Sequence, residues 1–489
     1  MQEENALLKK RVNLFDGVSF VAGSMIGSGI FIVSADIARN LGSPGWLMIV
    51  WLITGIITVI GALSYGELAA MMPSVGGQYV YLKEAYHPIV GFLFGWTTFL
   101  VIQCGSIAAV AVGFAKFSGV LIPWISEKNV LFSIGPVHVN TTQIVGMASI
   151  MFLTWLNTRG IVTGKTVQNI FSSTKVIALV GFIIIGLLIT KGLGAWQVNK
   201  EVFWQASKLG ENNQSIPITG FALVAAIGTA LVGSLFSADA WYNVTYISGE
   251  VINPRRNVPL SLLFGTVLVC VLYLLANFVY LRFLPLHGSP AGLDVAAKGI
   301  QFATDDRVAT SALSVVVGEY AAIIMAVFIM ISTMGCNNGM VLAGPRVYYA
   351  MAKDGLFFRK VGELNKKGVP GFAIIVQGAW AVLLCLSGTY SNLLDYVIFA
   401  VLIFFTLTIF AIFILRKKRP EIDRPYKAFG YPYIPALYIL TTMVIMIILL
   451  IYKPNYTFPG LGIVILGIPV FFIWNSIRKK KGIETVSVL

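Results

Sequence analysis

Long apolar runs occupy almost the whole of this 489-residue chain. A helix needs about 20 apolar residues to cross the hydrocarbon core of a bilayer, and twelve runs meet or approach that length. They lie at residues 13–40, 45–72, 88–122, 140–158, 166–190, 216–246, 258–281, 318–351, 370–388, 391–415, 431–452 and 459–477. No polar stretch between them is long enough for a separate folded domain. We therefore predict an all-α membrane protein with twelve transmembrane helices.

Composition supports a lipid bilayer as the surroundings of the chain. Residues are 57% hydrophobic and 11% charged, with a mean hydropathy of +0.83, whereas a soluble domain carries about 25% charged residues. The opening segment MQEENALLKKRV is polar, and a full-length apolar run follows it without a cleavage site of small residues. We therefore expect residues 1–12 to be a tail rather than a cleaved signal peptide.

The basic residues are distributed unevenly between the two sides of the expected membrane. The formal net charge is +14, and 24 of the 35 Lys and Arg residues fall in segments that share one side if the N-terminus is inside. The positive-inside rule then places both termini in the cytoplasm. A protein that binds nucleic acid would concentrate its basic residues on one domain, so we expect no nucleic acid partner.

Motifs of catalysis, metal binding and disulfide bonding are not found in the sequence. The segment RGIVTGKT, residues 159–166, lacks the first glycine and the preceding strand of a phosphate-binding loop. His87, His138 and His287 fall in separate loops without metal-ligand spacing. We expect no enzymatic activity, no cofactor and no metal. All four cysteines lie within apolar runs, so we expect free, buried thiols.

Two apolar runs are interrupted by small and polar residues. GSMIGSGIF, residues 23–31, interrupts the first run, and GSLFSADAWYN, residues 233–243, interrupts the sixth. Glycine costs a helix about 1 kcal/mol relative to alanine, although Gly23, Gly27 and Gly29 could also serve a tight helix contact. The two interruptions lie in spans one and six, which begin two halves of five helices each. Because five is an odd number, the second half enters the membrane from the opposite side. Interrupted helices at matching positions of an inverted repeat indicate a transporter binding site near the bilayer midplane.

An unwound helix in the membrane exposes backbone amides and carbonyls that need partners. An amino acid supplies both kinds, because its carboxylate accepts from amides at a helix N-terminus and its ammonium donates to carbonyls. Glycine allows the ligand to approach the backbone closely. We therefore expect Gly29→Val to abolish transport while leaving expression largely intact.

Several segments resemble the amino acid-polyamine-organocation superfamily. GSMIGSGIF is similar to its first helix, SYGELAAMMPSVGGQYVYLKEAYHPIVGFLFGW to its second and third helices, and VTYISGEVINPRRNVPLS to the segment after its sixth helix. ISTMGCNNG and LRKKRPEIDRPYK resemble the L-type amino acid transporter branch and its bacterial relatives. The resemblance implies alternating access, a cell membrane location, and a five-plus-five inverted repeat with discontinuous helices 1 and 6 and two peripheral helices. The expected parts are a cytoplasmic tail at 1–12, the first repeat at 13–190, the second repeat at 216–415, helices 11 and 12 at 431–477, and a cytoplasmic tail at 478–489.

The resemblance also implies the residues of a substrate site. The loop that holds the substrate's carboxylate and ammonium matches Ile26, Gly27, Ser28, Gly29 and Ile30, and the unwound sixth helix matches Phe236, Ser237 and Ala238. Phe236 takes the position of the aromatic gate. Two departures from the family pattern are Ala240, where a glycine is frequent, and Tyr242, where many L-type members have asparagine. Substrate preference therefore cannot be copied from the family.

Lys175 is the one lysine that falls deep within an apolar run. A charge in mid-membrane costs several kcal/mol and usually marks a functional site or a buried pair. The alternative is a side chain that reaches the cytoplasmic surface, across roughly 13 Å of helix. In the resembled family, sodium-independent members place this lysine where sodium-coupled relatives bind sodium. We expect Lys175 to have this coupling role, with Ser332 as a contact.

Asp239 places a carboxylate inside the interrupted part of the sixth run. Its partner could be a cationic substrate, Lys175, or nearby donors such as Ser237 and Asn243. We predict a transporter of neutral L-amino acids that works by sodium-independent exchange or proton-linked uptake. A cationic amino acid or polyamine exchanger is the alternative, and an ion channel would show a filter loop or a ring of charges. The external loop at 123–140 lacks cysteine, so no disulfide-linked heavy subunit is expected.

Overall fold

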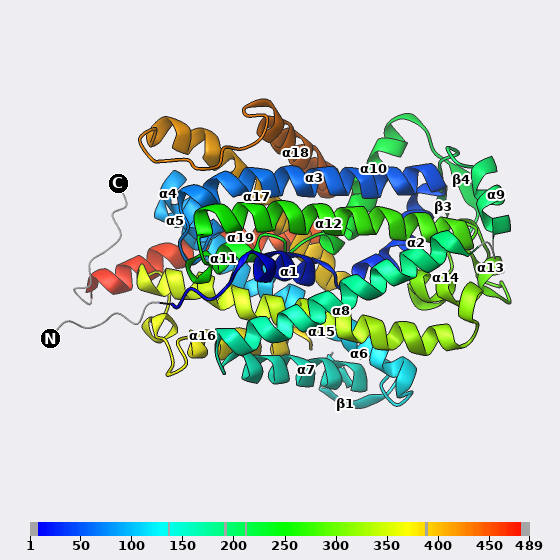
Figure 1. The fold of residues 1–489 in the computed structure, drawn as a ribbon, viewed down its shortest axis with the longest axis horizontal. Helices are drawn as coiled ribbons and strands as arrows, with labels where there is room; N and C mark the ends of the chain where they lie inside the picture. Colours follow the sequence, from blue (N-terminus) through cyan, green and yellow to red (C-terminus); the bar gives the residue numbers. More distant parts are fainter. Residues whose placement is uncertain (1–7, 135–136, 190–192, 211–212, 387–389, 481–489) are drawn as a thin grey trace.

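The computed structural model describes residues 8–134, 137–189, 193–210, 213–386 and 390–480. Helices run lengthwise through the molecule, and both ends of the described chain lie at the same end of the bundle, the left in Figure 1. We call this the terminal end, and the opposite end, with its two short hairpins, the hairpin end. The all-α fold class is thereby confirmed, because strands are confined to these hairpins.

Each of the twelve predicted spans coincides with one or more helices. The helices are α1 (Leu14–Met25) with α2 (Gly29–Leu41), α3 (Pro44–Met71), α5 (Pro88–Thr97) continued by the π-helical turn η1 (Thr98–Ile102) and α6 (Gln103–Leu121), α7 (Thr141–Asn157), α8 (Ile161–Leu188), α10 (Gly220–Ser237) with α11 (Asn243–Tyr246), α12 (Pro254–Phe283), α15 (Tyr320–Lys353), α16 (Gly371–Leu384), α17 (Tyr390–Lys418), α18 (Tyr433–Tyr452) and α19 (Pro454–Lys480).

Within the described residues, nine helices are long and apolar enough to cross a membrane, and the bent pair of α1 and α2 makes a tenth span. The fourth and ninth predicted spans are occupied by α7 and α16, which have 17 and 14 residues. Helices of that length fall short of the about 20 residues that a bilayer core requires. The protein is thus a multi-pass membrane protein, and the count of twelve spans stays a prediction.

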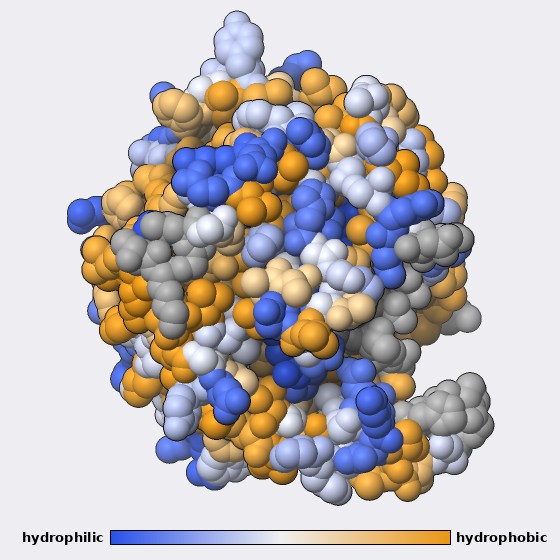
Figure 2. Space-filling view, turned by 90° about the vertical axis from the view of Figure 1, so that its right-hand side faces the viewer, coloured by the Kyte–Doolittle hydropathy of each residue, from blue (hydrophilic) through white to orange (hydrophobic). Residues whose placement is uncertain are grey.

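Shorter elements connect these helices. They are α4 (Gln78–Ala85), α9 (Leu193–Glu201), η2 (Ser248–Glu250), α13 (Val295–Lys298), η3 (Thr304–Asp306), α14 (Val308–Val317) and η4 (Arg359–Gly362). Two antiparallel hairpins pair β1 (Val130–Ile134) with β2 (Val137–Asn140), and β3 (Ser207–Leu209) with β4 (Ser215–Pro217). Figure 2 views the hairpin end, where hydrophilic residues form patches between hydrophobic ones.

Local sequence signals fix where several helices begin. Asn13 and Asp16 form a capping box at the start of α1, each side chain accepting the backbone N–H of the other at 2.9 Å. Asn140 and Gln143 do the same for α7. The side chain of Ser43 caps α3, which has a proline at its first turn. These caps satisfy amides that a helix start otherwise leaves without partners.

The packing relates spans that are five apart in sequence order. The second predicted span, α3, lies along the seventh, α12; α2 of the first span packs on α10 of the sixth; and α6 of the third packs on α15 of the eighth. This is the pairing expected of two five-helix units with opposite orientation. The boundaries of the repeats at 13–190 and 216–415 stay predictions.

Candidate functional site

The first helix break separates α1 from α2. Backbone at Ile26 is extended, with φ −73° and ψ 94°, and the two helix axes are bent by 42°. The break thus falls within the glycine-rich segment of the first apolar run, where the sequence predicts it.

Four consecutive backbone carbonyls at this break accept hydrogen bonds from side chains of other helices. Lys175 Nζ donates to the oxygens of Gly23 and Ile26 at 2.5 and 2.7 Å. Cys336 Sγ donates to the Ser24 oxygen at 2.9 Å, and the hydroxyl of Tyr273 donates to that of Met25 at 3.1 Å. The end of α1 is therefore held by α8, α12 and α15.

Lys175 is fully buried, with an exposed fraction of 0%. Its ammonium also donates to the backbone oxygen of Ser332 at 3.0 Å, and the Ser332 hydroxyl donates to the Ile26 oxygen at 3.0 Å. A lysine that reached the surface would not make these contacts. The structure thus brings the two predicted coupling residues together at the first break, while their role in coupling stays a prediction.

The second helix break lies between α10 and α11. The sequence places the interruption at 233–243, but α10 continues to Ser237, whose hydroxyl donates back to the Gly233 oxygen at 2.8 Å. Regular backbone ends just beyond, where Ala240 has φ +67°. Residues other than glycine pay about 1–2 kcal/mol in this left-handed region, so the backbone at Ala240 is strained.

Tyr273 of α12 joins the two breaks. Its hydroxyl lies 3.1 Å from the Met25 oxygen at the first break and 3.0 Å from the Ser237 oxygen at the second. Sequence analysis missed this residue, because a tyrosine within an apolar run carries no signal that separates it from ordinary core residues. Tyr273 belongs to the seventh span, and only the packing of α12 on α1 brings it to the break in the first span.

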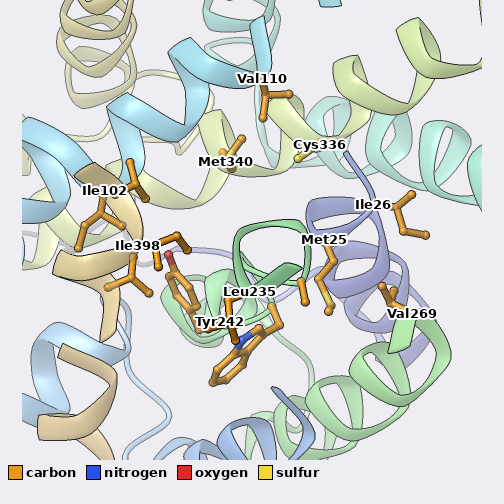
Figure 3. Packing of buried hydrophobic residues seen from close by; sticks show 14 of the residues in the cluster. Met25, Ile26, Ile102, Val110, Leu235, Tyr242, Val269, Cys336, Met340 and Ile398 are labelled. Carbon is orange, nitrogen blue, oxygen red and sulfur yellow. The ribbon is translucent and has the colours of Figure 1, made fainter. Parts of the chain in front are cut away.

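A cavity lies between the two breaks and the helices α6 and α15, enclosing about 350 Å³ of empty space including its open part. In Figure 3, Val110 and Met340 lie on the far side of this region from Met25. The lining residues are Ser24, Met25, Gly27, Ser28, Gly29, Ser106, Val110, Phe236, Ser237, Asp239, Ala240, Cys336 and Met340. We call it the central cavity. Polar and apolar groups thus face one space, as in most small-molecule sites.

Six of the predicted binding residues line the central cavity: Gly27, Ser28, Gly29, Phe236, Ser237 and Asp239. Ile26, Ile30 and Ala238 do not line it. The carbonyl of Ile26 accepts a hydrogen bond from Lys175, and the carbonyl of Ile30 accepts one from the Tyr280 hydroxyl at 3.3 Å. Ala238 lines a second, more apolar cavity of about 310 Å³ behind the second break, which Asp239 also borders.

The glycines of the first break differ in the space around them. A Cβ atom on Gly29 would lie 2.1 Å from Ser237 Oγ and 3.1 Å from the Ser237 Cα, so this glycine seats α2 against α10. A Cβ atom on Gly23 would lie 1.9 Å from Ser172 Oγ. At Gly27 the nearest atom, Cys336 Sγ, would be 3.4 Å away, an ordinary contact. The tight-contact interpretation therefore fits Gly23 and Gly29, and close approach of a ligand fits Gly27.

The carboxylate of Asp239 is buried and only partly satisfied. Oδ2 lies 3.4 Å from the Tyr242 hydroxyl, and Oδ1 has no hydrogen-bond partner among the described residues. Ser237 donates elsewhere, and both amide atoms of Asn243 also lack partners within the described chain. No cation of the described residues lies within ion-pair distance of Asp239. The neighbouring donors that the sequence suggested thus do not compensate this charge.

A buried ion pair joins α15 to the chain that follows the second break. Arg346 of α15 and Glu250 of η2 form a buried ion pair at 2.8 Å, with side chains 1% and 0% exposed. The backbone of Glu250 accepts hydrogen bonds from the amides of Arg11 and Val12, and Val12 forms a bridge with Val251. The N-terminal segment is thereby tied to the chain that follows the second break. Within the described residues no cluster of His, Cys, Asp and Glu side chains could hold a metal ion.

A helical bundle with two broken helices around a cavity in its middle defines a secondary transporter. A family model described as amino acid permease matches residues 12–473, and the chain belongs to this family. The predicted superfamily, amino acid transport, and the absence of an enzymatic class are thereby confirmed.

Three relatives illustrate the range of the similarity. The b(0,+)-type amino acid transporter 1 of Oryctolagus cuniculus is 31% identical over 86% of this chain and 79% of the relative. The large neutral amino acids transporter small subunit 2 of Mus musculus is 30% identical over 95% of this chain and 81% of the relative. The serine/threonine exchanger SteT of Bacillus subtilis is 28% identical over 98% of this chain and 100% of the relative.

Proposed function

We propose that the protein is a sodium-independent exchanger of neutral L-amino acids. The observation that carries the proposal is the Lys175 ammonium, which lies 2.5–3.0 Å from the carbonyls of Gly23, Ile26 and Ser332. The Lys175 ammonium among these carbonyls does the work that a bound sodium ion would do at the end of α1. Transport then needs no sodium gradient, and a relative named an exchanger supports the exchange of one substrate for another.

The central cavity provides the proposed substrate site. α2 begins at Gly29, which lines the central cavity beside Gly27 and Ser28, and the positive end of its helix dipole would favour the substrate's carboxylate there. Phe236 borders the same space and is the proposed gate. Relatives named for large neutral amino acids and for serine and threonine support a neutral substrate.

Cationic amino acids are a second candidate substrate class. The supporting observation is Asp239 Oδ1, a buried carboxylate oxygen without a partner among the described residues that borders the central cavity. Burial of an unpaired carboxylate is costly, and an ammonium or guanidinium group of a substrate would compensate it. A relative named a b(0,+)-type transporter is consistent with this reading.

We further propose a location in the cell membrane with both termini in the cytoplasm, which follows from the distribution of Lys and Arg. The terminal end then faces the cytoplasm. We also propose that the chain works without a disulfide-linked heavy subunit. All four cysteines are buried, and the external segment 123–140 contains none.

The test is a counterflow assay with purified protein in liposomes that contain a high concentration of unlabelled substrate. We expect labelled alanine, serine or leucine to accumulate, to saturate with concentration, and to do so equally in sodium and in choline buffer. Protein-free liposomes are the control. A steep requirement for sodium would contradict the proposed role of Lys175, and flux that neither saturates nor shows counterflow would contradict a carrier mechanism.

A further inference from the structure

The loop between α17 and α18, residues 419–432, concentrates positive charge at the terminal end. From Arg416 to Lys427 the chain reads RKKRPEIDRPYK, with six basic and two acidic residues. Neither the proposed substrate site nor the ion pair at Glu250 uses this segment. Its charge needs a physical explanation of its own, beyond a general preference for the inner side of the membrane.

One buried carboxylate is shared by two guanidinium groups at this loop. Glu67, near the end of α3, is 1% exposed and accepts hydrogen bonds from Arg416 at 2.7 and 2.9 Å. It also accepts the amide of Ala428 at 2.7 Å, and Arg424 Nε lies 3.6 Å from it. The side chain of Arg424 is only 10% exposed. A single negative charge therefore faces two positive charges that are largely removed from water.

These two arginines line a hollow that opens to solvent. The hollow contains about 810 Å³ of empty space including its open part, and its remaining lining residues are Pro420, Ile422, Asp423 and Lys427. Asp423 pairs with Arg255 of α12 at 3.2 Å. Lys427 is exposed and forms no ion pair or hydrogen bond with any described residue. Four cations and two carboxylates thus meet here, which leaves an excess of positive charge.

The hollow lies beside the surface that faces lipid. Phe429 and Tyr433, at the end of the loop, are 67% and 81% exposed. From Tyr433 onward, α18 presents exposed apolar side chains, among them Leu437, Leu440, Val444 and Ile447. Exposed aromatic residues next to an apolar helix face mark the level of the lipid headgroups. The positive hollow is therefore at headgroup depth.

We propose that this hollow binds the phosphate group of an anionic phospholipid in the leaflet at the terminal end. Both arginines already donate within the protein, Arg416 to Glu67 and Arg424 to the carbonyl oxygens of Leu415, Arg419, Pro420 and Ile422. They therefore offer a phosphate their positive charge, and the ammonium of Lys427 offers hydrogen-bond donors. Basic hollows at the inner end of transmembrane helices suit such headgroups. A free phosphate ion shares this chemistry, but the adjoining apolar face of α18 provides a surface for acyl chains that only a lipid can use.

The bound headgroup stabilises a junction of three spans. Glu67 belongs to α3, Arg416 to α17, and the loop leads into α18, while Arg424 donates to the carbonyl oxygens of Leu415 and Arg419 at the end of α17. A phosphate that compensates the second guanidinium group holds this junction together. The inference is independent of the substrate and of the proposed function, because none of these residues lines the central cavity.

The test measures thermal unfolding of the detergent-purified protein with added phosphatidylglycerol, with phosphatidylcholine of the same acyl chains, and with inorganic phosphate. We expect phosphatidylglycerol alone to raise the melting temperature. The variant K427E should raise the lipid concentration for half-maximal stabilisation by about tenfold, because it places a negative charge beside the phosphate. The matched control K366E makes the same charge change at an exposed lysine of another loop at the terminal end, and should leave the lipid response unchanged.

Several outcomes would overturn the proposal. Equal stabilisation by phosphatidylcholine would mean that acyl chains, not the phosphate charge, are recognised, and equal stabilisation by inorganic phosphate would assign the hollow to a free ion. An unchanged response in K427E, or an equal loss in K366E, would place the lipid effect elsewhere. Because the readout is unfolding rather than transport, failure here leaves the proposed exchange activity untouched.

Discussion

At the first helix break, the carbonyls of residues 23–26 all accept hydrogen bonds from side chains of neighbouring helices. At the second break, one oxygen of Asp239, both amide atoms of Asn243 and the hydroxyl of Tyr246 have no partner within the described chain. Both breaks interrupt a buried helix, but at the first only the hydroxyl of Ser24 lacks a partner within the described chain, whereas at the second several side-chain atoms do. In a membrane, backbone and side-chain polar groups must find partners, so the second break is the one whose polar groups are left to water or substrate.

This contrast suggests a division of labour between the two breaks. The first is a fixed support, whose carbonyls are held by a buried lysine and by side chains of neighbouring helices. The second contains the carboxylate oxygen of Asp239 that lacks a partner among the described residues, and the strained backbone of Ala240. Five substitutions test this division, and they are given from the largest expected effect to the smallest.

Lys175→Ala should remove the support of the first break. It leaves the carbonyls of Gly23 and Ile26 without their charged donor, and lost hydrogen bonds to a charged group cost about 1.5–3 kcal/mol. We expect counterflow per folded protein to fall by about 100-fold. The control is Lys116→Ala, an exposed lysine of α6. Transport that survives Lys175→Ala unchanged would show that the first break does not depend on this cation.

Gly29→Ala and Gly27→Ala apply one change to two glycines of the first break. At Gly29 the added methyl would meet Ser237 at 2.1 Å, so we expect a loss of about 1–3 kcal/mol in the free energy of unfolding. At Gly27 the methyl has room, and we expect normal stability with weaker substrate binding. Thermal unfolding and the counterflow KM measure the two effects. Equal destabilisation by both changes would argue against a ligand-facing role for Gly27. The clash at Gly29 also means that Gly29→Val should lower the yield of folded protein, contrary to the sequence-based expectation of intact expression.

Asp239→Asn tests whether the unpaired carboxylate of the second break recognises a substrate cation. We expect counterflow of alanine and serine to stay within about twofold, while any counterflow of arginine or lysine falls by about tenfold, as for a lost charged hydrogen bond. The measurement compares all four substrates in wild type and variant at equal protein. If the wild type does not transport arginine and the variant loses alanine exchange, Asp239 would instead have a role in coupling.

Ala240→Gly should have the smallest effect, and unlike the other changes it should stabilise the protein. Glycine adopts φ +67° without the cost that alanine pays, so we expect the free energy of unfolding to rise by about 1 kcal/mol. Ala238→Gly is the matched control, because φ at Ala238 is −97° and alanine is not strained there. Glycine at this position only raises the conformational entropy of the unfolded chain, which lowers stability. A lower melting temperature for Ala240→Gly than for Ala238→Gly would refute backbone strain at the second break.

Much of the framework could be predicted from the sequence because membrane helices leave a strong signal. The break in the first span was predictable from its glycines, and Lys175 from the rarity of a charge deep in an apolar run. The end of α10 was placed too early, since Ser237 keeps its helical hydrogen bond and small residues alone do not end a helix. Tyr273 was not predictable at all. Its importance comes from one hydroxyl that meets two carbonyls from distant segments, and no local pattern encodes such a meeting.

The π-helical turn η1 gives the third span a place where the length of the chain can change without loss of register. A π-helical turn contains one residue more than an α-helical turn, so it absorbs a residue that would otherwise rotate the remainder of the helix by about 100°. Ser106 and Val110 follow η1 in the chain and line the central cavity. Deleting one residue from 98–102 would therefore let the turn close as an α-helical turn, with Ser106 and Val110 still toward the cavity. The same deletion within the regular part of α6 would instead turn a different stripe of that helix toward the substrate.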